Sequence, residues 1–308
     1  MSEGLVAVFS ASGRPGLAQV RQLRRLGRRI RAVSRTSTPA FDGLEVVAAD
    51  LNDAPSLDRA CEGVDTVLFT SPTFAQRDKA VEHATRLGDS ARRAGVRRLV
   101  YNTTSWHPDR LTGVPTMDHG LLKTKALRET GVPLTVIRPS LFMDNLLTNW
   151  VKPQMLSTGV FAYPHKTDLN VSWICLDDVA KFMIEAAGRD EMEGETVDVG
   201  GPETLRPGQV AALLSEALGR PIVYQQITPR EFGERMHAIF KDVSGQDRET
   251  YVTNLEKHYL FKNEANPFLV PMEETLRRLP VELTPMKVWL GQQDWTLEAR
   301  ETVGSVSG

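Results

Sequence analysis

Short apolar runs alternate with longer amphipathic segments over the first 140 residues of the chain. The runs are rich in β-branched residues, and in the segments between them apolar positions recur every three or four residues, as on a helix buried along one face. Strands are predicted at 5–9, 30–34, 44–48, 66–70, 98–102 and 134–138, with helices at 16–26, 77–94 and 120–130. This alternation predicts a parallel sheet covered on both faces, and right-handed crossovers make it doubly wound.

The regular alternation ends after Pro139. Further on, the pattern predicts a helix over 142–156 that Pro153 interrupts and a helix over 177–187 that Asp177 or Asp178 caps. Strands are predicted at 196–199 and 222–225, with a helix between them at 209–218 and mostly helical structure from there to 295. We therefore expect an α/β fold with a sheet domain over 1–141, to which 177–200 returns. A smaller, mostly helical lobe comprises 142–176 and 201–300, and the Gly- and Ser-rich residues 302–308 form a frayed tail.

Composition narrows the class of protein. Of 308 residues, 41% are hydrophobic and 25% charged, and 37 Lys and Arg nearly balance 39 Asp and Glu. That balance favours neither a disordered chain nor nucleic-acid binding by gross charge. The longest stretch free of these charged residues, 153–165, has 13 residues with two prolines, whereas a membrane span needs about 20. With no signal-peptide start and only Cys61 and Cys175, the chain is expected to be cytoplasmic, without a membrane or nucleic-acid partner.

A glycine-containing turn follows the first predicted strand and leads directly into a helix. It reads Ser10-Ala11-Ser12-Gly13-Arg14-Pro15-Gly16. At such a turn, backbone N–H groups and the positive helix end can hold a pyrophosphate, and glycine is needed where a side chain would block the approach. Gly13 and Gly16 satisfy two of three expected positions, while Ser10 replaces the glycine of the tight turn. Alone, the motif also fits an ordinary strand-to-helix turn.

The end of the second predicted strand bears on the choice of nucleotide. An NAD site is expected to carry an acidic residue there, but this chain has Ser34 and Arg35. A guanidinium beside hydroxyl groups suits a 2′-phosphate, and Arg14 could close on the same phosphate from the other side. The alternative is that both arginines are solvated surface residues. If they bind the phosphate, the cofactor is NADP(H).

Several segments together resemble those of the NmrA-like family. Proteins of this family are atypical members of the short-chain dehydrogenase/reductase superfamily. The segments are 10–16, Ser34-Arg35, Ala49-Asp50-Leu51, Thr70-Ser71-Pro72, 131–139, Phe142-Met143-Asp144-Asn145 and 177–180. The resemblance covers most of the chain and implies a Rossmann-type fold. The family includes quinone, triphenylmethane-dye and isoflavone-type reductases as well as redox-sensing regulators. Its usual loop is Gly-Ala-Thr-Gly-x-x-Gly, from which this chain departs at Ser10, narrowing the turn, and at Ser12.

The resemblance also implies residue roles. The implied positions are Asp50 and Leu51 at the adenine, Thr70, Ser71 and Pro72 along the ribose and pyrophosphate, Pro139 to Leu141 at the nicotinamide, and Thr104 in place of the superfamily's active-site serine. Thr103 and Ser105 are alternatives to Thr104, which could also be a simple strand-end hydroxyl.

Hydride transfer to a ketone leaves an alkoxide that needs a proton donor. The superfamily usually supplies a tyrosine with a lysine four residues later, yet none of the five tyrosines here has that partner. His119 and Lys123 have the same spacing and share one helical face. We predict Lys123 near the nicotinamide ribose and His119 as the acid or a substrate-orienting donor. Lys125 is an alternative to Lys123 for this role. Lys123 could also be a solvated surface lysine, and His119 could simply cap the helix or pack near its start.

The substrate would be bound by side chains from predicted loops and crevice positions. The candidates are Trp106, His107, Phe142, Tyr163 and Trp173, with Met143 and Trp150 nearby in sequence. Because large aromatic residues more often build cores than pockets, only some of these are expected to reach a ligand. The histidines and cysteines show no metal-ligand spacing, so no metal is predicted.

The leading hypothesis is an NADPH-dependent reductase that passes hydride to a conjugated small molecule such as a quinone, enone, imine or dye. Without the tyrosine, acceptors that need little acid assistance are favoured over simple ketones. A second hypothesis is a non-catalytic NADP-binding redox sensor, and a third is an isomerase or cyclase on the same fold. We expect the protein to be a monomer or homodimer.

Overall fold

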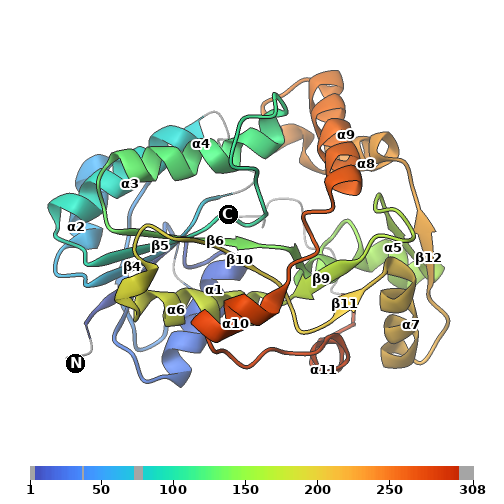
Figure 1. The fold of residues 1–308 in the computed structure, drawn as a ribbon, viewed down its shortest axis with the longest axis horizontal. Helices are drawn as coiled ribbons and strands as arrows, with labels where there is room; N and C mark the ends of the chain where they lie inside the picture. The colour runs from blue at the N-terminus through green and yellow to red at the C-terminus, as the bar shows by residue number, and fades with distance from the viewer. Residues whose placement is uncertain (1–3, 37, 73–78, 298–308) are drawn as a thin grey trace.

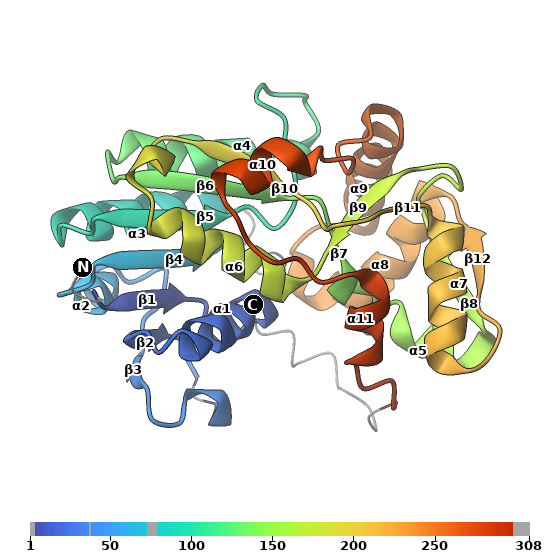
Figure 2. The same ribbon diagram turned by 60° about the horizontal axis from the view of Figure 1, so that its bottom comes forward.

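A seven-stranded parallel sheet in the order β10-β6-β5-β4-β1-β2-β3 forms the centre of the structure (Figures 1 and 2). The structure is a computed structural model that describes residues 4–36, 38–72 and 79–297. The strands are β1 (Val6–Phe9), β2 (Ile30–Val33), β3 (Glu45–Val47), β4 (Thr66–Thr70), β5 (Arg98–Asn102), β6 (Leu134–Pro139) and β10 (Thr196–Val199). All seven strands were predicted, within one residue of these bounds.

Helices cover both faces of this sheet (Figure 1). One face carries α2 (Ala54–Cys61), α3 (Ala80–Arg93) and α4 (Pro115–Glu129), and the other carries α1 (Arg14–Arg25), α6 (Leu176–Ala187) and α10 (Met272–Arg278). Every residue of β4 and β5 is buried, as expected for strands packed on both sides. The predicted doubly wound, Rossmann-type α/β fold is therefore confirmed.

Two helix predictions in the sheet domain were wrong, one in missing a helix and one in where a helix begins. The prediction missed α2, which is short and carries Pro55 in its first turn. Helix α4 begins at Pro115, earlier than predicted, because proline suits a first helical turn and the Asp118 carboxylate accepts hydrogen bonds from the N–H groups of Thr112 and Gly113. His119 therefore lies inside the helix. The first residues of the helix predicted at 77–94, and the tail 302–308, lie outside the described residues.

A lobe adjoins the end of the sheet (Figure 1). Its elements are β7 (Leu141–Phe142), the 3₁₀ turn η3 (Met143–Leu147), α5 (Lys152–Thr158), β8 (Val160–Tyr163), β9 (Val171–Ile174), β11 (Thr204–Leu205), α7 (Pro207–Leu218), β12 (Val223–Gln226), α8 (Pro229–Ser244), α9 (Arg248–Ala265) and α11 (Met286–Gly291). Strands β11, β9 and β7 form one small sheet, and β12 and β8 form another. Two further 3₁₀ turns, η1 (Pro39–Phe41) and η4 (Asp190–Met192), lie in the sheet domain.

The lobe also differs from its prediction. The helix expected at 142–156 does not form, because Pro153 is tolerated only in a first turn and α5 begins immediately before it. Strand β8 was missed because its partner, β12, comes from a distant part of the chain. Helix α6 is not capped by Asp177 or Asp178: the buried Asp178 carboxylate instead accepts hydrogen bonds from Lys181 and from the N–H and hydroxyl of Thr284. None of the described helices has both the length and the hydrophobicity to cross a membrane.

Candidate active site

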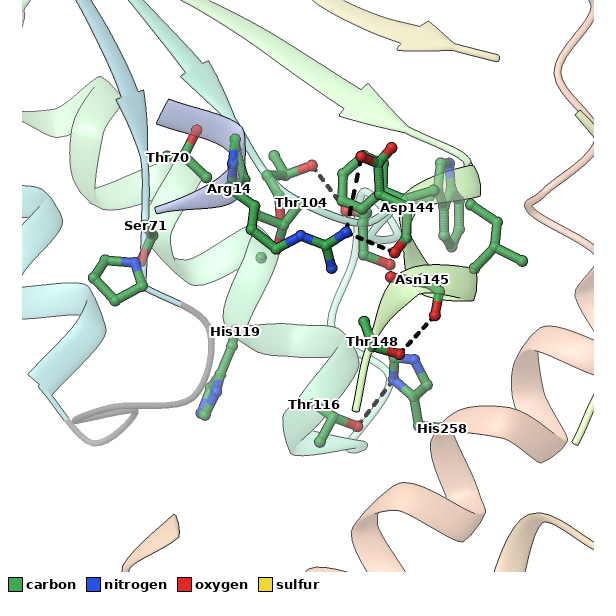
Figure 3. A pocket seen from close by; sticks show the side chains of 18 of the residues that line it. Arg14, Thr70, Ser71, Thr104, Thr116, His119, Asp144, Asn145, Thr148 and His258 are labelled. Atoms are coloured by element: carbon green, nitrogen blue, oxygen red, sulfur yellow. Dashed lines mark hydrogen bonds and ion pairs between the residues drawn. The ribbon is translucent and has the colours of Figure 1, made fainter. Parts of the chain in front are cut away.

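A cavity of about 660 Å³ lies between the C-terminal edge of the main sheet and the lobe. Its walls are formed by the segments that follow β1, β4, β5 and β6, by α4, and by α8 and α9 (Figure 3). A smaller pocket of about 290 Å³ shares Ser10, Ser12 and Pro72 with it and is lined by residues that follow β2 and β3. Ligands of open parallel sheets bind at this edge, so the two spaces form the candidate active site.

The loop between β1 and α1 packs its backbone tightly. Ser10 has a φ of 56°, a left-handed conformation, and its carbonyl accepts a hydrogen bond of 3.0 Å from the Gly13 N–H. A Cβ atom on Gly16 would lie 2.3 Å from the Ser10 carbonyl oxygen, so position 16 has no room for a side chain. Helix α1 has no side-chain cap and no acidic residue in its first turn. Its positive end is therefore suited to an anion.

Arg14 contacts the lobe and not the smaller pocket. Its guanidinium donates a 2.9 Å hydrogen bond to the Asp144 carbonyl and lies 3.9 Å from the Asp144 carboxylate (Figure 3). Burial raises the pKa of Asp144, and Arg14 opposes that rise. Arg14 lines only the main cavity, whereas Arg35 lines only the smaller pocket. In this structure the two arginines therefore line different, adjoining pockets, and Arg14 is bound to Asp144 of the lobe.

The smaller pocket contains the residues predicted for the adenosine end of a nucleotide. Ser34, Arg35, Asp50 and Leu51 all line it. The Ser34 hydroxyl donates a 2.9 Å hydrogen bond to the Ser12 hydroxyl, which ties β2 to the loop. Hydrogen bonding by Asn52 lowers the pKa of Asp50, and the exposed Arg35 guanidinium contributes to the same shift. The pocket thus has a cation at its rim.

Helix α4 presents His119 and Lys123 to the main cavity. Lys123 is buried, and its ammonium lies 5.9 Å from the centre of the Tyr101 ring. Lys125 is exposed and does not line the cavity. Of the two lysines, only Lys123 therefore lies on the face of α4 that borders the cavity. In Figure 3 the His119 ring points from α4 away from the pair formed by Arg14 and Asp144.

Three hydroxyl residues follow β5 and line the cavity together. Thr104 has a φ of 62°, and its N–H donates a 2.8 Å hydrogen bond to the Asn102 side chain. The Thr103 hydroxyl donates to the carbonyls of Ser105 and Ile137, which fixes this turn against β6. Strained left-handed conformations of non-glycine residues are held where the surroundings impose them, often at active sites.

Four of the five predicted substrate residues line the cavity, namely Trp106, His107, Phe142 and Tyr163. Trp173 does not: its side chain is 1% exposed and belongs to the core of the lobe, as is common for large aromatic residues. Pro139 also lies outside the lining, although Leu141 is part of it.

The histidine of this set is held by the protein itself. His107 Nδ1 donates to the Pro108 carbonyl, and Nε2 accepts from the Thr124 hydroxyl. Burial lowers the pKa of His107. The close approach of α4 to this ring explains Gly120, where a Cβ atom would lie 2.7 Å from the imidazole. Both ring nitrogens of His107 are therefore used within the protein, and its main role is to position α4.

The sequence reasoning missed the wall that α8 and α9 contribute. It consists of Phe232, Met236, Tyr251, Leu255, His258, Tyr259 and Lys262, with Phe268 beyond α9. These positions belong to amphipathic helices without a motif, so only their apolar faces signal burial. In the described residues, no group of three His, Cys, Asp or Glu side chains converges as metal ligands would.

Comparison with known proteins agrees with this architecture. The NmrA-like family model matches residues 2–290. An NAD(P)H azoreductase of Xenophilus azovorans is 29% identical over 75% of this chain and 80% of its own, and a (4-alkanoyl-5-oxo-2,5-dihydrofuran-3-yl)methyl phosphate reductase of Streptomyces griseus subsp. griseus is 31% identical over 72% and 77%. The structure of Citrobacter sp. triphenylmethane reductase complexed with NADP(H) has a TM-score of 0.74 at 22% identity, covering 93% of this chain and 99% of that one. The chain belongs to the NmrA-like family.

Proposed function

We propose that this chain is an NADPH-dependent reductase that passes hydride to a conjugated small molecule of the quinone, enone, imine or dye type. The observation that carries the proposal is the continuity of the site. The small pocket with Arg35 and the aromatic cavity beside Lys123 meet at the loop from Ser10 to Gly16. One extended dinucleotide fits this path, with its nicotinamide end beside the acceptor. Two relatives support the reaction class, namely the azoreductase and the reductase of a (4-alkanoyl-5-oxo-2,5-dihydrofuran-3-yl)methyl phosphate.

The residues present fit such a cofactor. Glycine at position 16 lets the start of α1 pack against the loop backbone, and the uncapped end of this helix is suited to a pyrophosphate. Arg35 and Ser34 would hold the 2′-phosphate, and Lys123 the nicotinamide ribose. The other proposed contacts are Asp50 and Leu51 at the adenine, Ser12, Gly13, Arg14 and Pro15 along the pyrophosphate, Thr70, Ser71 and Pro72 along the ribose, and Pro139 to Leu141 at the nicotinamide.

The bound cofactor supplies the hydride, and the protein supplies position and polarity. Thr104 and His119 would orient the polar end of the acceptor from two sides of the cavity. Trp106, Phe142 and Tyr163 would stack on its conjugated rings. The cavity is large enough for a flat aromatic molecule beside the nicotinamide. We propose that the protein works in the cytoplasm as a monomer or homodimer. Its partner is a small-molecule substrate and not a nucleic acid.

Turnover separates this function from the two alternatives. Purified protein is mixed with NADPH and a panel of quinones, enones, imines, azo dyes and cationic dyes, and the loss of NADPH absorbance is followed. We expect consumption with at least one of these classes. Tight NADPH binding with no consumption by any member would identify a redox sensor, and conversion of a substrate without nucleotide would identify an isomerase or cyclase.

Arg35→Ala tests the nucleotide preference. Loss of a charge-assisted hydrogen bond to the 2′-phosphate costs about 1.5 to 3 kcal/mol, which corresponds to weaker NADPH binding by about 10- to 150-fold. NADH affinity should stay nearly constant, because NADH lacks this phosphate. Isothermal titration of both nucleotides measures the difference. Arg59→Ala removes an equal charge from an exposed site on α2 outside both pockets and should leave both affinities unchanged. Equal losses for NADPH and NADH in Arg35→Ala would reject the assignment.

A further inference from the structure

A buried lysine from the lobe meets the sheet domain inside the main cavity. Lys262 lies in the last turn of α9 with 3% of its surface exposed, and it lines the cavity. Its ammonium donates a 2.5 Å hydrogen bond to the hydroxyl of Ser105, the residue directly after the strained Thr104. Ser105 follows β5, so this contact lies at the edge of the sheet where the acceptor is expected.

The charge of Lys262 has no opposite charge beside it. Its ammonium lies 4.8 Å from the centre of the Phe268 ring, and no Asp or Glu forms an ion pair with it among the described residues. Burying an ammonium without a counter-charge costs free energy, and this cost favours the neutral amine. Burial lowers the pKa of Lys262 to about 7, so the group can both carry and release a proton near neutral pH.

Other titratable groups surround this lysine. His165 faces it from the segment after β8, and burial together with Lys262 lowers the pKa of His165 to about 3, so His165 is neutral where Lys262 titrates. Burial raises the pKa of both Tyr163 and Tyr259. His258, on the same helix, is hydrogen-bonded to the Thr116 hydroxyl (Figure 3). Among these neighbours, Lys262 is the group placed on the Ser105 hydroxyl.

We propose that Lys262 is a catalytic residue, the acid that protonates the acceptor once hydride has been transferred, and that Ser105 positions its ammonium. This inference rests on the proposed reductase function. Hydride brings two electrons and one hydrogen to a quinone or azo group and leaves an anionic oxygen or nitrogen. An N–H bond of Lys262 then breaks as the new O–H or N–H bond forms, and the neutral amine regains a proton from water. His119 is left to orient the acceptor.

The chemistry of the acceptor provides a sharp test. A quinone or an azo compound takes up hydride and a proton, whereas a cationic triarylmethane dye takes hydride on its central carbon and becomes neutral without a proton. Lys262→Met, which keeps length and removes the acid, should slow quinone or azo reduction by about 100-fold or more, the usual contribution of general acid catalysis. Reduction of the cationic dye should stay within about twofold of the parent rate or increase.

The pH profile gives a second readout. The ammonium is present below its pKa, so parent kcat/KM for the quinone should be highest below pH 7 and fall as the pH rises through about 7. The profile of Lys262→Met should be flat across this range. Lys257→Met, at an exposed position of the same helix, is the matched control and should behave as the parent on both acceptors.

Melting temperature and NADPH affinity are measured for every variant, so that a folding defect is recognised. If Lys262→Met does not fold, Ser105→Ala keeps the lysine and should lower quinone reduction by about tenfold with little change for the dye. Equal slowing of both acceptors, or no slowing of the quinone, would overturn the role of Lys262 while leaving the reductase function intact. A parent protein that binds NADPH but reduces no acceptor would overturn both.

Discussion

Gly16→Ala is expected to destabilise the protein by about 2 to 3 kcal/mol and to weaken NADPH binding by more than tenfold. The new Cβ would lie 2.3 Å from the Ser10 carbonyl oxygen and 2.7 Å from the Ala11 Cα. Both are backbone atoms, so relief requires opening the turn between β1 and α1. Opening the turn moves the N–H groups proposed to hold the pyrophosphate, and stability and affinity are therefore lost together.

Gly208→Ala is the matched control for this substitution. Gly208 also lies in the first turn of a helix, α7, but a Cβ atom there would have no neighbour within 4 Å. Alanine at an unobstructed helical position is neutral or stabilising by up to about 1 kcal/mol. Urea unfolding and NADPH titration of the two variants provide the comparison. If both substitutions had the same small effect, the tight packing of the loop would be disproved.

His165 is expected to make the folded protein sensitive to acid. Its side chain is 1% exposed, and neither ring nitrogen has a hydrogen-bond partner in the described part of the chain. Burial first, and Lys262 second, lowers the pKa of His165 from its ordinary 6.5 to about 3. Below pH 6.5 the histidine of the unfolded chain therefore binds a proton, whereas His165 of the folded protein stays neutral. The free energy of unfolding consequently falls as the pH falls.

The size of this effect follows from the linkage of protonation and folding. Well below pH 6.5 each further pH unit costs about 1.4 kcal/mol until the folded pKa is approached. Because the unfolded histidine is only half protonated at pH 6.5, His165 alone should remove about 2 kcal/mol between pH 6.5 and 4.5. His165→Phe retains an aromatic ring against Tyr163, Tyr259 and Phe268 but cannot bind the proton. Urea unfolding at both pH values should show a smaller loss in this variant than in the parent.

A histidine elsewhere in the lobe serves as the control. His237→Phe changes a partly exposed ring on α8 and should leave the acid sensitivity of the parent in place. If His165→Phe lost as much stability as the parent between pH 6.5 and 4.5, the His165 ring would have to be protonated in the folded protein, contrary to its burial. Both variants are followed by the same unfolding curves.

The sequence predicted most of the residues that line the two pockets near the β1–α1 loop. Three segments lie at or just after the end of a predicted strand of the parallel sheet, namely Ser10 to Gly16, Ser34 with Arg35, and Asp50 with Leu51. Such segments necessarily meet at one edge, because parallel strands all end on the same side. The structure accordingly places all of these residues except the buried Ala11 around two adjoining pockets. The exception is the pairing of Arg14 with Arg35, which depends on Asp144 in the lobe.

The remaining walls of the main cavity were decided by tertiary structure. Trp173 looked like a pocket residue but packs in the core of the lobe, and Lys123 and Lys125 were distinguished only when one face of α4 packed against the sheet. Lys262 and Ser105 are 157 positions apart, and no local pattern indicates that they meet.

The amino-acid sequence by itself thus determined the doubly wound sheet and the family, and it pointed to the loops that line the two pockets. These follow from hydrophobic periods and from motifs only a few residues long, whose physical meaning is local. Only the tertiary structure decided which side chains of the lobe, including those of α8 and α9, line the main cavity. Those contacts depend on how helices pack over long sequence separations, and amphipathic helices of similar pattern can pack in several orientations.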